Sequence, residues 1–229
     1  MPVKIEMVDV VFSWDVMPLL RKVNLAVSNG EVVIIGGKCG HGTSTLLELM
    51  VGLETPKSGR VLWDGVDITS LSDAELMLRR QQIGYVFQSG ALISNFTAFD
   101  NIALPLRNRG DLPEGEIKNT VRAVMEEIGL FNVDTRFPEA LSEWQCRAVA
   151  VARALAGVPD VLFLDEPVGG IDQETAGGIL NVIEKHWKVR GMAIVMISHE
   201  LSIWPHIAAQ RLTLDNGKLF PAEPLMKSG

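Results

Sequence analysis

Residues 32–45 read VVIIGGKCGHGTST, an apolar run that passes through a glycine-rich turn into a segment that favours a helix. A strand, a glycine loop and a helix form the context of a phosphate-binding loop, because glycines let backbone N–H groups close around phosphate and the helix N-terminus attracts negative charge. The glycine spacing and the pair Ser44-Thr45 fit this pattern, but Thr43 stands where the pattern has lysine. Taken alone, a glycine turn without its lysine is more often a simple tight turn.

Three further apolar runs end in polar residues of chemical interest. The runs are 83–87, 161–164 and 193–197. Asp165 and Glu166 follow the second run, an arrangement that suits a magnesium-associated aspartate and a glutamate that activates water. Gln88 follows the first run, and His199 follows the third through Ser198. Each would be an ordinary strand end in isolation, but the carboxyl ends of parallel strands meet at one edge of a sheet, so we expect these side chains and the glycine loop to converge there.

The remaining pattern predicts the fold class. Val23, Leu25 and Val27 alternate with polar residues as in a half-buried strand, and Asp64-Gly65 marks a hairpin turn. The four runs 32–35, 83–87, 161–164 and 193–197 are apolar on both faces, as in a parallel sheet covered by helices. Ile117, Val121, Val124 and Ile128 follow helical spacing. We therefore predict an α/β protein with a parallel core, an antiparallel β piece on the N-terminal side and a helical insertion at about 90–158.

Composition excludes several classes of protein. The chain has 229 residues, 47% of them hydrophobic, and its mean hydropathy of +0.20 argues against a disordered or fibrous chain. Its net charge of −7 argues against sequence-independent binding of nucleic acid. Two cysteines, Cys39 and Cys146, fit a reducing compartment. The N-terminus does not have the layout of a signal peptide and no apolar run reaches membrane-spanning length, so we expect a soluble cytosolic protein.

Over essentially its whole length the chain resembles the ATP-binding-cassette (ABC) ATPases, which implies a P-loop NTPase with a RecA-like parallel core, an antiparallel β subdomain and a helical subdomain. We expect a single nucleotide-binding domain over 1–229. The resemblance implies ATP and Mg²⁺ as ligands and assigns roles to matching residues. The Walker A loop is matched by Gly37 to Thr45, and its nucleotide contacts would come from Gly37, Gly40, Gly42, Thr43, Ser44 and Thr45. The metal site is matched by Ser44, by Gln88 of the Q-loop and by Asp165 of Walker B, and the catalytic positions by Glu166, by His199 of the switch and again by Gln88. Nucleotide contacts are also implied for Asp172 of the D-loop, for Ser142 of the signature segment and for Trp14, at the aromatic position that stacks on adenine. On sequence alone, Trp14 is equally well read as an ordinary half-buried aromatic residue.

The signature segment departs from the family pattern. The family has Leu-Ser-Gly-Gly-Gln, whereas residues 141–145 are LSEWQ. Ser142 and Gln145 still form a Ser-x-x-Gln capping box, so we expect a helix to begin here. Glu143 places a carboxylate at the positive end of that helix, and Trp144 removes the close backbone approach that glycine permits. Together with Thr43, these residues predict weak ATP binding and slow hydrolysis.

A finer resemblance concerns residues 87–106. FQSGAL at 87–92 and FDNIALPL at 99–106 look like the ATPase subunit of Mla-type phospholipid transporters, although lipoprotein-release and cell-division ABC subunits have related segments. The resemblance implies an integral-membrane permease subunit, an ABC homodimer or heterodimer, and a place on the inner face of the cell membrane.

Two classes of function remain open on the sequence alone. One is a transport subunit that couples ATP to movement of a phospholipid, with weakened hydrolysis. The other is a non-hydrolysing scaffold or regulatory subunit that keeps the fold for docking. An altered sequence, whose parent carried the usual lysine and glycines, is a third interpretation.

Overall fold

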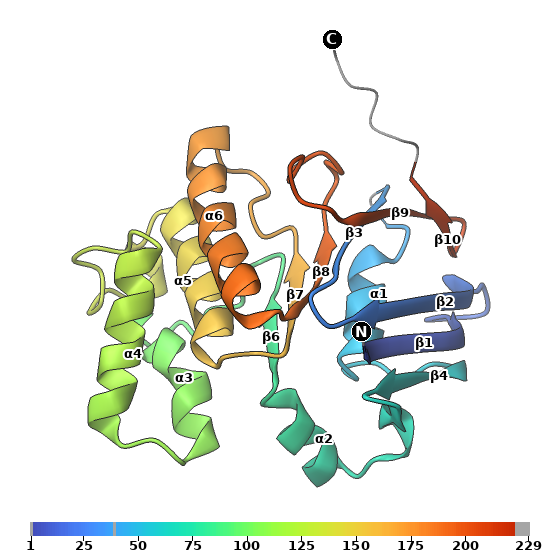
Figure 1. Ribbon diagram of the computed structural model, residues 1–229, viewed down its shortest axis with the longest axis horizontal. Coiled ribbons are helices and arrows are strands. Elements are labelled where there is room, and N and C mark those ends of the chain that lie inside the picture. Colours follow the sequence, from blue (N-terminus) through green and yellow to red (C-terminus); the bar gives the residue numbers. More distant parts are fainter. Residues whose placement is uncertain (1, 39, 223–229) are drawn as a thin grey trace. The chain divides into compact units, whose positions relative to one another are not determined.

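The computed structural model describes residues 2–38 and 40–222 and divides the chain into two compact units. The first unit comprises 1–77 and 193–229, and the second comprises 78–192 (Figure 1). Cys39, part of the predicted glycine loop, lies outside the described residues. No helix in the described ranges is long and apolar enough to cross a membrane.

The first unit carries an antiparallel sheet at its N-terminal side. Its strand order is β2-β1-β4-β5, with β1 at Val3–Phe12, β2 at Leu20–Ser28, β4 at Ser58–Trp63 and β5 at Val66–Asp67. β1 stays continuous through a register shift between Met7 and Val10, where Asp9 has a φ of 48°. The predicted hairpin turn at Asp64-Gly65 joins β4 to β5, and both of its residues have positive φ.

The same unit contains a parallel group of strands. β3 (Val32–Gly37) pairs in parallel with β8 (Ala193–Ile197) on one edge and with β9 (Gln210–Asp215) on the other. β10 (Lys218–Pro221) adds to β9 in the antiparallel direction. Val32 to Ile35 are fully buried, as a strand between two neighbours requires. Helix α1 (Thr43–Met50) follows β3 directly after the glycine loop; the short helices η1 (Ile68–Ser70) and α2 (Asp73–Arg80) follow β5.

The second unit is mainly helical. β6 (Ile83–Val86) and β7 (Val161–Asp165) pair in parallel, and α3 (Ala98–Arg109), α4 (Glu114–Glu127), η2 (Pro138–Ala140) and α5 (Glu143–Ala156) lie between them in sequence (Figure 1). α6 (Gln173–Arg190) follows β7. The residues that predicted α4 are buried along one side of that helix or, for Ile128, cap its end.

One prediction about these strands is wrong. β6 is not buried on both faces, because Ile83 and Tyr85 are half-buried while Gly84 and Val86 are buried. Within the second unit β6 pairs with β7 alone and contacts α5, so its alternating pattern is that of a strand covered mainly on one face.

A buried amide orders the segment between β6 and α3. The side chain of Asn101 is inaccessible to solvent. Its Oδ1 accepts a hydrogen bond from the N–H of Ile93 at 2.8 Å, and its Nδ2 donates to the carbonyls of Ile93, Phe96 and Thr97 at 3.1–3.2 Å. The Asn101 side chain thus supplies hydrogen-bond partners for backbone groups of this loop that no strand or helix pairs.

We expect Asn101→Ala to lower the free energy of unfolding by about 3 kcal/mol, because it leaves several buried backbone groups without partners. Chemical denaturation checks this value. Asn119→Ala, at an exposed position of α4, is the control and should change stability by less than about 0.5 kcal/mol. Equal losses in both variants would contradict the role given to Asn101.

Candidate functional site

The glycine loop of the first unit has the backbone that an anion site needs. Gly40 and Gly42 have φ of 81° and 92°, in the left-handed region. A Cβ on Gly40 would meet no atom within 4 Å, so the loop is open there. Gly42 is the N-cap of α1, which has no side-chain cap and no acidic residue in its first turn. The first N–H groups of α1 are thus left for a ligand, and the helix dipole favours an anionic one.

Side chains around the loop supply little positive charge. The methyl Cγ2 of Thr43 lies 2.8 Å from the point that a Cβ on Gly37 would occupy, so Thr43 folds against the end of β3. Nδ1 of His41 lies 3.5 Å from a carboxylate oxygen of Asp215. Lys38 is exposed. Two residues could replace the missing lysine: His41, which lies beside an acid, and Lys38, which is solvated.

His199 reaches the same loop. It follows β8 through the buried Ser198, and its Nδ1 lies 3.1 Å from the carbonyl oxygen of Gly37. Because a carbonyl only accepts, Nδ1 carries the hydrogen in this bond. The structure thus brings the predicted switch residue to the start of the predicted phosphate loop, as the convergence of strand ends implies.

Trp14 is more exposed than an ordinary core aromatic residue. Its side chain is 60% exposed, and its ring packs edge-to-face on the buried Phe12 with ring centroids 5.0 Å apart. The ring is therefore held at its base and open to stacking by a planar ligand.

The second unit holds the two predicted carboxylates. Asp165 ends β7 and is 4% exposed, and Glu166 follows at 9%. Glu166 has a φ of 48°, a conformation uncommon for a residue other than glycine, and strained backbone of this kind is concentrated at functional sites. Both carboxylates are thus buried, whereas the acids of an ordinary strand end are solvated.

The Q-loop backbone is held by α5. Arg147 Nη1 donates to the carbonyl of Gln88, while Arg153 donates to the carbonyls of Gly90 and Ala91 at 2.8 Å each. Burial lowers the pKa of Arg153. The Gln88 side chain itself is exposed. Sequence reasoning missed both arginines, since their spacing of six along α5 gives no sign of a shared target.

The start of α5 agrees with the predicted capping box. Ser142 is the N-cap, and its N–H donates to Oε1 of Gln145 at 2.9 Å. Glu143 lies in the first turn, with Oε1 3.2 Å from the point that a Cβ on Gly170 would occupy. Its carboxylate therefore lies against the D-loop of its own chain. Gly170 has a φ of 81°.

Asp172 has a structural role that sequence reasoning did not assign. It is the N-cap of α6, where its carboxylate accepts from the backbone N–H of Thr175 at 2.9 Å and from the Thr175 hydroxyl at 2.7 Å. The hydrogen bonds from the Thr175 backbone and then its side chain hold the pKa of Asp172 below its usual range.

The sequence model of the family described as "ABC transporter" matches residues 20–169. The chain belongs to the ABC transporter family. The α/β fold predicted for an ABC ATPase is likewise confirmed, since solved ABC cassettes have the same fold.

Two curated relatives of this ABC protein are methionine import ATP-binding proteins. MetN 2 of Pseudomonas syringae pv. tomato is 36% identical over 201 residues, covering 88% of this chain and 60% of the relative. MetN of Haemophilus influenzae is 38% identical over 200 residues, covering 87% and 58%. The chain thus spans about three-fifths of the length of these relatives.

Solved structures of ABC cassettes align with nearly the whole of this chain. The dimeric structure of MJ0796, a bacterial ABC transporter cassette, superposes with a TM-score of 0.87 at 30% identity, covering 94% of this chain and 96% of that one. A post-hydrolysis dimer of MJ0796 bound to ADP and Pi gives 0.86 at 29%, covering 95% and 98%.

The site residues of this ABC cassette divide between the two units. The first unit contains Trp14, the Walker A residues Gly37, Gly40, Gly42, Thr43, Ser44 and Thr45, and His199; the second contains Gln88, Ser142, Asp165, Glu166 and Asp172. His199 and Gly37 are in contact within the first unit. In the second, Gln88 is tied to α5, whose N-cap is Ser142.

We expect Arg153→Lys to loosen the Q-loop, because one ammonium group cannot bond two carbonyls in the planar geometry of a guanidinium. Unfolding should become easier by about 2 kcal/mol. Hydrogen–deuterium exchange in a peptide covering 88–93 should speed up. Arg122→Lys, an exposed position on α4, is the matched control. If exchange at 88–93 does not change in Arg153→Lys, Arg153 does not order the loop.

Proposed function

We propose that this ABC cassette is the nucleotide-binding subunit of a transporter, and that it binds Mg-ATP weakly and hydrolyses it slowly. The observation that carries the proposal is the open loop of Gly40 and Gly42 before an α1 N-terminus that has neither side-chain cap nor acid. This backbone fits phosphate without help from a side chain. The MJ0796 structure bound to ADP and Pi supports the choice of nucleotide.

The two units together carry side chains of the chemical type that a magnesium nucleotide needs. The Ser44 hydroxyl, the Gln88 amide and the Asp165 carboxylate are oxygen ligands of the kind that Mg²⁺ prefers. When bound, the ion would neutralise phosphate charge. In this proposal Glu166 accepts a proton from the attacking water, His199 contacts the reacting phosphate group, and Trp14 stacks on adenine. Thr45, Ser142 and Asp172 complete the proposed nucleotide-binding set.

Two features argue for slow turnover. Thr43 carries no charge and folds against Gly37, so the phosphates gain no charge-assisted hydrogen bond from this position. Glu143 places negative charge in the first turn of α5. Both changes act on charge that must be stabilised in the transition state, so they reduce the rate more than binding.

A non-hydrolysing scaffold or regulatory subunit is the second candidate. It is favoured by Thr43 and Glu143, because a cassette that serves only for docking needs neither the Walker A lysine nor an open signature helix. The two candidates differ in one measurable quantity, the rate of phosphate release from ATP.

We expect Thr43→Lys to strengthen Mg-ATP binding by about tenfold or more, the value of one charge-assisted hydrogen bond. Turnover should stay low until Glu143→Gly and Trp144→Gly are added. The effects of the Walker A repair (Thr43→Lys) and of the signature repair (the two glycines) on the rate of hydrolysis should be strongly non-additive. Calorimetry of nucleotide binding and steady-state phosphate release measure the two effects.

The control is Glu166→Gln in the repaired chain, which should remove hydrolysis and leave binding. Fast hydrolysis by the unmodified chain, abolished by Glu166→Gln, would contradict the proposal and point to Lys38 or His41 as substitutes for the lysine. A repaired chain that binds ATP but never turns over would favour the scaffold.

We further propose a permease partner, an ABC dimer and a position on the inner face of the cell membrane. The resemblance to ABC ATPases implies that the permease docks on a surface after the Q-loop, which in this chain includes five apolar residues. None of the five is buried: Ala91 is exposed, and Leu92, Ile93, Phe96 and Phe99 are half-buried. The MJ0796 cassette is dimeric in its solved structure, which supports dimerisation here.

We expect Leu92→Glu to reduce co-purification with a co-expressed permease subunit by about fivefold or more, because the change puts a charge into an apolar contact. Thermal stability should change little, since Leu92 is already partly solvated. Leu53→Glu, at an exposed leucine of the first unit, should leave co-purification intact. Loss in both variants would show a non-specific effect.

The transported substrate is the finest part of the proposal. The segments at 87–92 and 99–106 predict a phospholipid, and the curated relatives give that prediction no support. Both carry the name of methionine importers, so they favour a small amino acid. The two substrates are separated by measuring uptake of labelled methionine, and the lipid composition of the membrane, in cells with and without this chain. Unchanged methionine uptake together with an altered lipid composition would favour the phospholipid as the substrate.

A further inference from the structure

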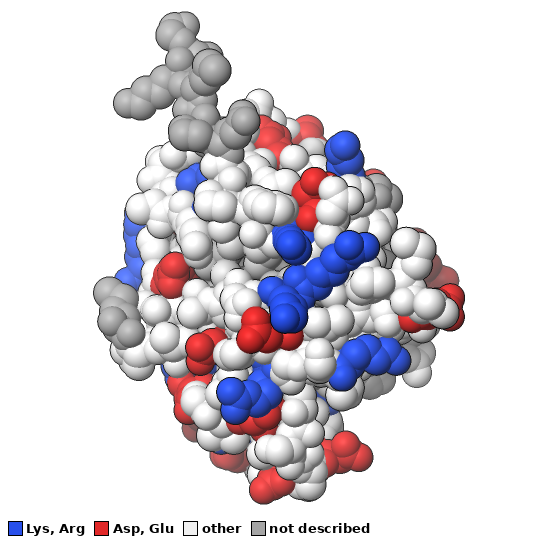
Figure 2. All heavy atoms as spheres, turned by 90° about the vertical axis from the view of Figure 1, so that its right-hand side faces the viewer, with Lys and Arg blue, Asp and Glu red and all other residues white. Residues whose placement is uncertain are grey.

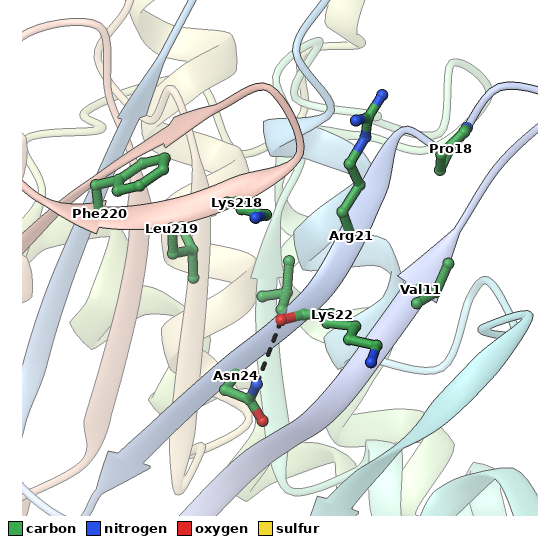
Figure 3. A pocket seen from close by; sticks show the side chains of 9 residues that line it. Val11, Pro18, Arg21, Lys22, Asn24, Lys218, Leu219 and Phe220 are labelled. Carbon is green, nitrogen blue, oxygen red and sulfur yellow. Dashed lines mark hydrogen bonds between the residues drawn. The ribbon is translucent and has the colours of Figure 1, made fainter.

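A groove in the first unit lies apart from the loop and carboxylates described above. It runs between the edge strands β2 and β10, with a volume of about 590 Å³ (Figure 3). Arg21, Lys22 and Lys218 line it, together with the half-buried apolar residues Val11 and Leu219. Figure 3 shows Arg21, Lys22 and Asn24 on β2 and Lys218, Leu219 and Phe220 on β10, with Val11 of β1 and Pro18 of the preceding loop beside them.

Among the described residues, each of the two strands lies at the end of a sheet. β2 ends the sheet β2-β1-β4-β5, and β10 pairs with β9 on one side. The N–H of Arg21 donates to the carbonyl of Gly217, the residue before β10, at 2.7 Å, and in the described ranges no backbone hydrogen bond joins β2 to β10 itself. The edges therefore part beyond Arg21, and such an edge is a template for another strand.

The groove is cationic in an acidic chain. Arg21, Lys22 and Lys218 are exposed, and none of them forms an ion pair with a carboxylate of the described residues. Two acids lie near the groove: Asp9 accepts from Asn24, and Asp215, the register partner of Lys218 on β9, has a carboxylate oxygen 3.5 Å from Nδ1 of His41. Figure 2 shows Lys and Arg side chains gathered in the middle of one face of the molecule. The net charge of the chain is −7, so this concentration of unpaired cations is local.

We propose that this groove binds an extended acidic segment of a partner protein, which adds as a strand to an open edge. Successive side chains of a strand point to opposite faces, so a segment that alternates acidic and apolar residues would place its carboxylates on the cations and its apolar side chains on Val11 and Leu219. The segment is expected to be acidic because the groove carries cations, and extended because it would pair with the backbone edge of β2 or β10.

Lysines on edge strands also have a protective use, because their charge discourages unwanted pairing. Lys22, with a φ of 51° beside the irregular stretch of β1, would suit that use. Protection requires that strands be repelled, and binding requires that acidic strands be held, so the two interpretations predict opposite results with an acidic peptide.

The test uses the full chain and a fluorescein-labelled peptide, GEVEVEVEG, in low-salt anisotropy titrations. Its controls are GEEEEVVVG, which has the same composition in blocks, and the alternating peptide N-methylated at every Glu and Val, which cannot donate backbone bonds from either edge. Vesicles containing phosphatidylserine form a separate arm. Lys218→Glu is paired with Lys118→Glu, an exposed lysine of α4, and Arg21→Glu with Arg122→Glu.

We expect the alternating peptide to bind, and N-methylation to weaken it about tenfold. Lys218→Glu and Arg21→Glu should each weaken it about fivefold, and the α4 variants less than about twofold, since reversing an exposed charge removes one attraction and adds one repulsion. Equal binding of the block peptide, or equal effects of the α4 variants, would reduce the result to non-specific charge and overturn the proposal. Binding to vesicles without binding to peptide would assign the groove to a membrane. Absence of all binding would assign the lysines to edge protection.

Discussion

Strand β3 has a neighbour on each edge and no solvent on either face, and the first unit depends on that constraint. Its amide groups are paired with β8 and β9, so the chain can leave the strand only at its end, where Gly37 begins the loop. The loop then has to turn within a few residues into α1, which requires left-handed backbone at Gly40 and Gly42. The same rigidity delivers His199 from β8 to the Gly37 carbonyl.

The second unit fixes its irregular segments with side chains instead of strands. The carbonyls of the Q-loop are occupied by guanidinium groups of α5, and the next segment is wound around the amide of Asn101. Both supports come from regular helices, so loops without backbone pairing keep a defined shape. α5 serves twice, since the helix whose N-terminus carries Ser142 also supplies the arginines. A change at the signature end can therefore reach the Q-loop through one rigid element.

Much of the fold followed from periodicity, because burial on one or both faces leaves a mark in the residue pattern. Val23, Leu25 and Val27 indicated β2, and Ile117 to Val124 indicated α4, as observed. The prediction for β6 was wrong because Ile83 and Tyr85 are apolar without being enclosed. The hydrogen bonds of Arg147 and Arg153 could not be predicted, since their targets are loop carbonyls distant in sequence. The capping role of Asp172 was missed although Asp is a preferred N-cap residue, because the residue was interpreted through the family motif. The site residues rest on a family motif, and their roles stay predictions.

Gly42 is restricted by two separate demands, and they limit how the loop can change. A Cβ at this position would lie 2.8 Å from Cγ of Leu19, and the φ of 92° would be strained for any L side chain. A smaller residue at 19 would remove the collision and leave the strain. No single replacement elsewhere therefore compensates for the loss of this glycine. Thr43 beside it begins the regular helix α1 and is not under the positive-φ constraint. The shape of the loop thus depends on its glycines, while the charge at the loop depends on separate positions.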